Sequence, residues 1–180
     1  MVKLANKLKF QKIKIGILGG TFDPAHKGHL EISKHAKKKF DLKNIIWAIT
    51  KKNPFKNDSK SKLTSRILFA KRFVKKNDYI RVRFYEEKID SNRIIDLIEY
   101  LNKDNKFEIY FIMGADNLIN FHKWYKWKSI IKKSNILVFD RQGFKTKSLK
   151  SITFNKTNKK SLTFVNFKKV NISSSQLRKV

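Results

Sequence analysis

The stretch GGTFDPAHKGH, residues 19–29, decides the fold of this chain. An apolar run at residues 13–18 precedes it and is typical of a buried strand, while residues 30–36 follow with the pattern of a helix. A strand, a glycine-rich turn and a helix together present backbone N–H groups and the positive end of a helix to a phosphate. Because His26 and His29 are three residues apart, both lie on one side of the first helical turn. The stretch therefore predicts a nucleotide-phosphate site.

Two other interpretations of the paired histidines are open, a metal site and a solvated loop. The chain contains no cysteine and no third ligand at a recognisable spacing, which disfavours a metal site. An ordinary loop is disfavoured because glycines, an aspartate, a proline and both histidines all fall at one strand-to-helix junction.

The same stretch, extended to GGTFDPAHKGHL, resembles the (T/H)xGH signature of the nucleotidyltransferase superfamily. In that superfamily the paired histidines bind the triphosphate of ATP or CTP and stabilise charge as one phosphate attacks another. The resemblance implies that His26 and His29 are the catalytic residues. It also implies a set of phosphate-binding neighbours: Gly19, Gly20, Thr21 and Phe22.

A second segment, NISSSQLR at residues 171–178, resembles the ISSTxIR signature near the end of these enzymes, with Ser175 in place of Thr. Hydroxyls and backbone N–H groups at the start of a short helix after Ser173 would form an anion cradle, and Arg178 adds a positive charge one turn later. A plain serine helix cap is the alternative. Beside the first motif, the segment predicts the second half of an ATP site, made by four residues: Ser173, Ser174, Ser175 and Arg178.

Strand-like and helix-like runs alternate along the chain, which is typical of an α/β domain with a parallel sheet. The expected strands lie at residues 13–18, 44–49, 79–84, 107–113, 136–139 and 161–167, the third of them nearer an edge. The expected helices follow residue 30 and lie at residues 63–74, 91–101, 116–121 and 124–132, with Ser91 as a helix cap. Residues 142–160 show no clear period and are expected to form a mobile surface loop. We predict one doubly wound, Rossmann-like, mostly parallel domain over residues 1–180, with its ligands beyond the carboxyl ends of the central strands.

Two further segments narrow the resemblance to the nicotinate-nucleotide adenylyltransferases. IMGADN at residues 112–117 resembles the (I/M)GxD segment of that family, and Lys123-Trp124-Tyr125 resembles its KWY segment. The resemblance implies that Gly114 and Asp116 lie at the mononucleotide and that Trp124 stacks on its pyridine ring. Core packing is the alternative for Trp124 and the expectation for Trp127.

Two other stretches extend this mononucleotide site. NPFK at residues 53–56 takes the place of the family's PPHK loop, so that Lys56 matches a lysine that approaches phosphate, although a solvated lysine is the alternative. Arg66 matches an arginine that begins the following helix. Residues 138–144 resemble the family's xRPGF segment, with Gln in place of Pro, and place Arg141 at the border of the adenosine site.

The chain departs from the family in one segment. Where the family has SYTxDT, residues 91–96 read SNRIID, so the tyrosine and both threonines that hold the nicotinate carboxylate are missing. We hypothesise that Arg93, or backbone N–H groups near it, supplies the carboxylate contact. The departure leaves the choice between the acid and the amide mononucleotide open. The chain also stops at Val180, where relatives continue, so either the lineage is minimal or a short C-terminal extension is missing.

Composition limits the other classes of function. The chain has 43 Lys and Arg against 14 Asp and Glu, a net charge of +29 that taken alone suggests nucleic acid or an anionic membrane. The lysines are spread along the chain with Asn, Ile and Phe, as an AT-rich coding sequence favours, and no basic stripe with interleaved aromatic residues is present. Residues 1–10 lack a signal-peptide core, and no run of about eighteen apolar residues predicts a membrane span. The absence of cysteine fits a reducing cytoplasm.

The resemblance implies one reaction: transfer of the adenylyl group of ATP to nicotinate mononucleotide, giving deamido-NAD and pyrophosphate in NAD biosynthesis. We expect Mg²⁺ to arrive with ATP and no metal site built by the protein. Nicotinamide mononucleotide or phosphopantetheine as the acceptor, and cytidylyl transfer, stay open as alternatives. A basic nucleic-acid-binding protein is the alternative of a different class, and the sequence does not choose between a monomer and a homo-oligomer.

Overall fold

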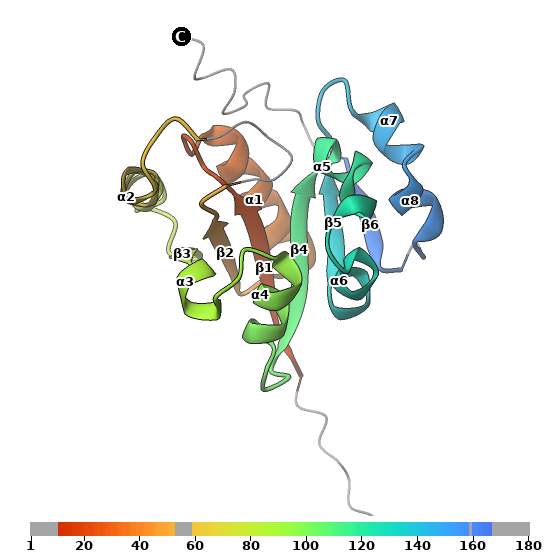
Figure 1. Cartoon of the computed structure of the whole chain (residues 1–180), viewed down its shortest axis with the longest axis horizontal. Coiled ribbons are helices and arrows are strands. Elements are labelled where there is room, and N and C mark those ends of the chain that lie inside the picture. Colours follow the sequence, from red (N-terminus) through yellow and green to blue (C-terminus); the bar gives the residue numbers. More distant parts are fainter. Residues whose placement is uncertain (1–10, 53–58, 159, 167–180) are drawn as a thin grey trace, which may run out of the picture.

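The computed structural model describes residues 11–52, 59–158 and 160–166. The strands are β1 (Ile13–Gly20), β2 (Asn44–Ile49), β3 (Ile80–Phe84), β4 (Phe107–Gly114), β5 (Asn135–Phe139) and β6 (Leu162–Val165). The helices are α1 (Lys27–Phe40), α2 (Leu63–Phe73), α3 (Glu86–Ile89), α4 (Ile94–Leu101), α5 (Ala115–Ile119), the 3-10 helix η1 (Phe121–Lys123), α6 (Trp127–Lys133), α7 (Lys145–Leu149) and α8 (Ile152–Lys156). The strands pair in parallel in the order β3-β2-β1-β4-β5-β6 (Figure 1), which confirms the doubly wound α/β prediction.

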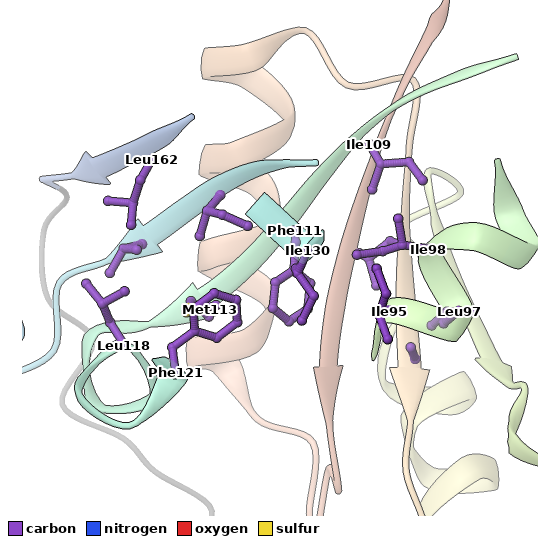
Figure 2. Packing of buried hydrophobic residues seen from close by; sticks show 14 of the residues in the cluster. Ile95, Leu97, Ile98, Ile109, Phe111, Met113, Leu118, Phe121, Ile130 and Leu162 are labelled. Carbon is purple, nitrogen blue, oxygen red and sulfur yellow. The ribbon is translucent and has the colours of Figure 1, made fainter. Parts of the chain in front are cut away.

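Each face of the sheet carries its own hydrophobic cluster, because alternate residues of a strand point to opposite faces. Ile15 and Ile17 of β1 pack on one face with residues of α4, α5 and α6. Figure 2 shows this cluster, with Ile95 and Ile98 of α4 beside β1 and β2. Leu18 packs on the opposite face with residues of α1 and α2. The sheet is therefore buried between two helical layers, as a parallel sheet requires.

β1 lies between β2 and β4, and the chain leaves β1 and β4 toward opposite faces of the sheet. In α/β sheets a crevice forms at this point, beyond the carboxyl ends of the two strands, and ligands bind there. The glycine turn follows β1 at this edge, and Asp116 follows β4. The topology thus brings together two motifs that are far apart in the sequence.

Two expectations about individual elements are wrong. Ser91 does not cap the expected helix, because α4 begins at Ile94 and Arg93 is its N-cap; the Ser91 hydroxyl instead accepts from the Arg93 N–H and donates to Asp96. Residues 142–160 are not one loop, since they contain α7 and α8, each of five residues. Such short helices offer too few positions for a helical period to show in the sequence.

The other expected elements agree with the structure within a few residues at their ends. β3 is an edge strand, as its alternating pattern predicts. The helix expected after Ser173 lies outside the described residues. Among the helices that the structure does describe, none has the length and apolar character needed to cross a membrane.

Candidate active site

An aromatic side chain in the turn between β1 and α1, that of Phe22, packs into the core and contacts the ring of His29. Phe22 has a positive φ of 47°, and its ring is only 1% exposed. The ring stacks on Trp47 at 4.9 Å between centroids and contacts the ring of His29 at 4.6 Å. The Phe22 side chain therefore belongs to the core beneath the histidines, and phosphate binding at Phe22 stays a prediction for its backbone.

The two histidines share a capping arrangement at the start of α1. His26 is the N-cap, and its Nδ1 accepts a hydrogen bond from the Gly28 N–H at 3.1 Å. The backbone N–H of His26 donates in turn to Nδ1 of His29 at 3.3 Å, and the two ring centroids lie 3.9 Å apart. Because Nδ1 of each ring accepts a hydrogen, the proton of each neutral ring resides on Nε2. On each ring, Nε2 is therefore the nitrogen that carries the N–H.

Burial lowers the pKa of His26 to about 4, with a smaller contribution from the positive charge of Arg141. His26 is 9% exposed, so its ring loses most of its hydration in the folded protein. The ring is therefore neutral at pH 7 and acts as a hydrogen-bond donor rather than as a cation.

A cavity of about 320 Å³ lies beside this turn, on the side of α3 and α4. Gly19 and Gly20 line it at the end of β1, and Thr50 lines it at the end of β2. A Cβ added at Gly19 would meet no atom closer than 3.9 Å, so a side chain there would occupy cavity space without a clash. The cavity thus lies at the crevice that the topology predicts.

Two of the residues predicted to bind the mononucleotide line this cavity, Arg93 and Trp124. The Arg93 guanidinium lies 4.0 Å from the centroid of the Tyr125 ring, a cation–π contact that holds the guanidinium at the cavity wall. Trp124 is half-buried and contacts Phe121 and Phe111 at centroid distances of 5.1 and 6.0 Å. The Trp124 ring therefore packs on the core and also lines the cavity, and its stacking on the pyridine ring stays a prediction. Trp127 packs against the core, as expected.

Three other predicted residues lie apart from the cavity lining. Arg141 donates to Asp116 at 2.6 Å, and its charge acts on His26. A Cβ added at Gly114 would come within 2.5 Å of Asp116 Oδ1, so this glycine leaves room for the carboxylate. The structure thus groups Asp116 and Arg141 with the histidines rather than with Trp124. The remaining predicted residues lie outside the described part of the chain: Lys56, Ser173, Ser174, Ser175 and Arg178.

Sequence reasoning missed a polar network at the ends of β2 and β3. Glu86 lines the cavity and accepts from the Thr50 hydroxyl and from the Lys51 N–H, the latter at 3.1 Å. Thr50 follows β2 directly and Glu86 follows β3 after one residue, so the carboxyl-end rule for parallel sheets points to both. Arg66 is also part of this network, and it donates to backbone carbonyls instead of reaching the cavity.

Metal ligands do not gather at the site within the part of the chain that the structure describes. Within residues 11–52, 59–158 and 160–166, no group of three or more His, Asp or Glu side chains is arranged to hold a metal ion. The donors at the turn are N–H groups, which suit an anion and not a cation.

Comparisons with known proteins agree with this geometry. The sequence model of the cytidylyltransferase-like family matches residues 17–180. The chain is 75% identical over 180 residues to the probable nicotinate-nucleotide adenylyltransferase of Pelagibacter ubique (strain HTCC1062), with 100% of both chains covered. It is 35% identical over 171 residues to the probable nicotinate-nucleotide adenylyltransferase of Clostridium botulinum (strain Alaska E43 / Type E3), covering 92% of this chain and 84% of that one. The fold is similar to that of Plasmodium falciparum nicotinic acid mononucleotide adenylyltransferase complexed with NaAD, with a TM-score of 0.73 and 19% identity over 94% of this chain and 83% of the other.

Proposed function

The chain belongs to the nicotinate-nucleotide adenylyltransferases, within the cytidylyltransferase-like family, and from that premise we propose how its residues divide the reaction between them. The activity is that of NAD biosynthesis, in which ATP and nicotinate mononucleotide give deamido-NAD and pyrophosphate. Both substrates carry phosphate. We assign ATP to the turn that carries the histidines and the mononucleotide to the cavity beside that turn.

The reaction joins two phosphates in one displacement. An oxygen of the mononucleotide 5′-phosphate forms a bond to the α-phosphorus of ATP, and the bond from that phosphorus to the bridging oxygen breaks as pyrophosphate leaves. A phosphate dianion carries no proton that must be removed, so the protein needs no general base. Alignment and charge stabilisation therefore provide the catalysis.

The Nε2–H groups of His26 and His29 hold the α- and β-phosphates in this proposal. This assignment is supported by the hydrogen bonds of the two Nδ1 atoms. Each accepts from a backbone N–H, at 3.1 and 3.3 Å, so Nε2 is the donor on each ring. This is the observation that carries the proposal. Thr21 lies on the same turn and Arg141 is close enough for its charge to act on His26, and we assign both to the phosphates as well.

The cavity takes the pyridine mononucleotide. Trp124 offers a flat face for the pyridine ring, and Arg93, stacked on Tyr125, offers a bidentate partner for its carboxylate. This assignment replaces the family's missing SYTxDT contacts with a side chain of this chain's own. Mg²⁺ would enter with ATP and neutralise charge on its phosphates. A chain without cysteine fits the reducing cytoplasm, where we place the enzyme.

Pyrophosphate release from Mg-ATP tests this assignment, with the acid and the amide mononucleotide offered in separate reactions. The wild-type protein is expected to prefer the acid. His29→Ala is expected to lower kcat by ~10² or more, the effect of removing one charge-stabilising donor. Lys34→Ala, an exposed substitution farther along α1, is the matched control and is expected to keep full activity. Near-full turnover by His29→Ala would remove this histidine from the catalytic group.

A further inference from the structure

Arg66 connects three segments of backbone near the two proposed substrate sites. It lies on α2 and is only 4% exposed. Its Nη1 donates to the carbonyl of Thr21 at 2.5 Å and to that of Thr50 at 2.9 Å. Nη2 donates to the Lys51 carbonyl at 3.2 Å, and Nε donates to the Ser61 carbonyl at 3.2 Å. One guanidinium thus joins three segments: the turn between β1 and α1 (residues 21–26, called the phosphate turn below), the residues that directly follow β2, and the residues that directly precede α2.

Two carboxylates also bind these segments, by accepting hydrogen bonds from their backbone N–H groups and from the Thr50 hydroxyl. Asp23, on the phosphate turn, accepts from the backbone N–H groups of Lys60 and Ser61 at 2.7 and 3.4 Å. Glu86 accepts from the Thr50 hydroxyl and from the Lys51 N–H. Burial lowers the pKa of Arg66, and the negative charges of Asp23 and Glu86 act against that shift. The guanidinium therefore stays charged within this network.

The segments that Arg66 joins are the ones that must stay aligned. Thr21 directly follows Gly20 on the turn that carries the histidines, whereas Thr50 lines the cavity. A displacement reaction requires the attacking oxygen in line with the leaving group, and a shift of about 1 Å costs up to ~10²-fold in rate. A planar guanidinium has five N–H donors in a fixed fork, whereas lysine has three on one atom. Four carbonyls from three segments therefore need arginine.

We propose that Arg66 is a positioning residue that sets the phosphate turn relative to the mononucleotide cavity, and that its loss lowers the rate of the chemical step more than the affinity for either substrate. The inference rests on the proposed division of the substrates between the turn and the cavity. Arg66 touches neither substrate in this scheme. It acts through the carbonyls of Thr21, Thr50 and Lys51.

Steady-state kinetics of Arg66→Lys test this role, because lysine keeps the charge but not the fork. We expect kcat to fall by about 10- to 100-fold while KM for ATP and for nicotinate mononucleotide each change less than about threefold. The control is Ile109→Val, a buried substitution in the first half of β4, away from the carboxyl ends of the strands. Both variants are compared with wild type by thermal unfolding. The control is expected to lower the melting temperature with kcat unchanged.

Three results would overturn the inference: kcat of folded Arg66→Lys within about threefold of wild type, a rise confined to KM, or a kcat loss equal to that of Ile109→Val. If Arg66→Lys does not fold, Glu86→Ala decides, since it removes the acceptor of both the Thr50 hydroxyl and the Lys51 N–H. That variant is expected to lose kcat by about three- to tenfold, and full kcat would overturn the inference. Failure of the proposed function is distinguishable, because wild type and Ile109→Val would then also be inactive with the acid mononucleotide.

Discussion

At the scale of single residues, the burial of His26 has a consequence for stability as well as for hydrogen bonding. The same ring caps α1 and faces the phosphate turn, and it is almost excluded from water. A buried neutral imidazole donates through Nε2 without bringing a positive charge that must be desolvated. The fold thus sets the protonation state that the proposed chemistry uses.

This burial predicts acid destabilisation in a defined window. The pKa of His26 is lowered from 6.5 to about 4, so below pH 6.5 the unfolded chain binds a proton that the folded chain does not. Stability is therefore lost as the pH falls from 6.5 to 4, and at pH 4.5 the loss is about 2 kcal/mol. His26→Asn, which keeps an N-cap acceptor, removes the titrating group. Urea unfolding at pH 7 and pH 4.5 should show a smaller acid loss in the variant; equal losses would contradict the assignment.

Arg93 gives a prediction about substrate choice. If its guanidinium holds the nicotinate carboxylate, Arg93→Gln removes a charge-assisted pair of hydrogen bonds that the amide substrate never makes. KM for the acid mononucleotide is expected to rise about tenfold or more, with KM for the amide nearly unchanged. Arg81→Gln, which removes an exposed arginine from the edge strand β3, is the matched control for net charge. Equal changes for acid and amide would assign the carboxylate contact to backbone N–H groups instead.

At the scale of elements, β1 contains glycines with two different purposes. A Cβ at Gly16 would lie 3.0 Å from Ile112 and 3.1 Å from Ile45 and Leu42, so the neighbouring side chains leave no room. At Gly19 the nearest atom would be 3.9 Å away, in the cavity lining. Packing therefore requires the first glycine, whereas the open cavity requires the second.

A matched pair of substitutions separates these purposes. Gly16→Ala is expected to destabilise the protein by about 1–3 kcal/mol through overpacking, with kcat/KM of the folded protein unchanged. Gly19→Ala is expected to leave stability nearly unchanged and to raise KM for the mononucleotide, because the methyl group takes up cavity space. Thermal unfolding and steady-state kinetics on both variants check the pair. Loss of stability in Gly19→Ala, or of substrate affinity alone in Gly16→Ala, would contradict the assignment.

The strands and helices differ in how well the sequence predicts them. The inner strands are largely apolar runs and are recognisable because both of their faces are buried, whereas the edge strand β3 is recognisable by its alternation. α7 and α8 were missed because each is only five residues long, too short for a helical period to show. The Ser151 hydroxyl caps α8 by accepting from the Phe154 N–H, whereas α7 has no side-chain cap. The histidine turn was predicted from one contiguous motif. The roles of Arg66 and Glu86 were not, since their partners are backbone groups from other segments, which leave no side-chain pattern.

At the scale of the whole molecule, the net charge of +29 has two interpretations that kinetics can separate. A positive field draws polyanionic ATP and mononucleotide toward the site and raises association rates at low ionic strength. If the lysines instead reflect only composition, distant ones have no effect. The sheet provides suitable positions, because Lys43, Lys76 and Lys103 are exposed and precede β2, β3 and β4, at the edge away from the site.

Replacing Lys43, Lys76 and Lys103 together by glutamate lowers the net charge by six, from +29 to +23, and leaves the residues at the carboxyl ends of the strands unchanged. At ~10 mM salt, where the Debye length is ~30 Å, the field from the far edge still reaches the site. We expect kcat/KM for ATP to fall about twofold or more there, with kcat unchanged. At ~0.5 M salt, screening should make the variant and wild type equal. A triple variant with wild-type kcat/KM at low salt would show that charge far from the site has no part in substrate capture, and would leave coding composition as the origin of the lysines.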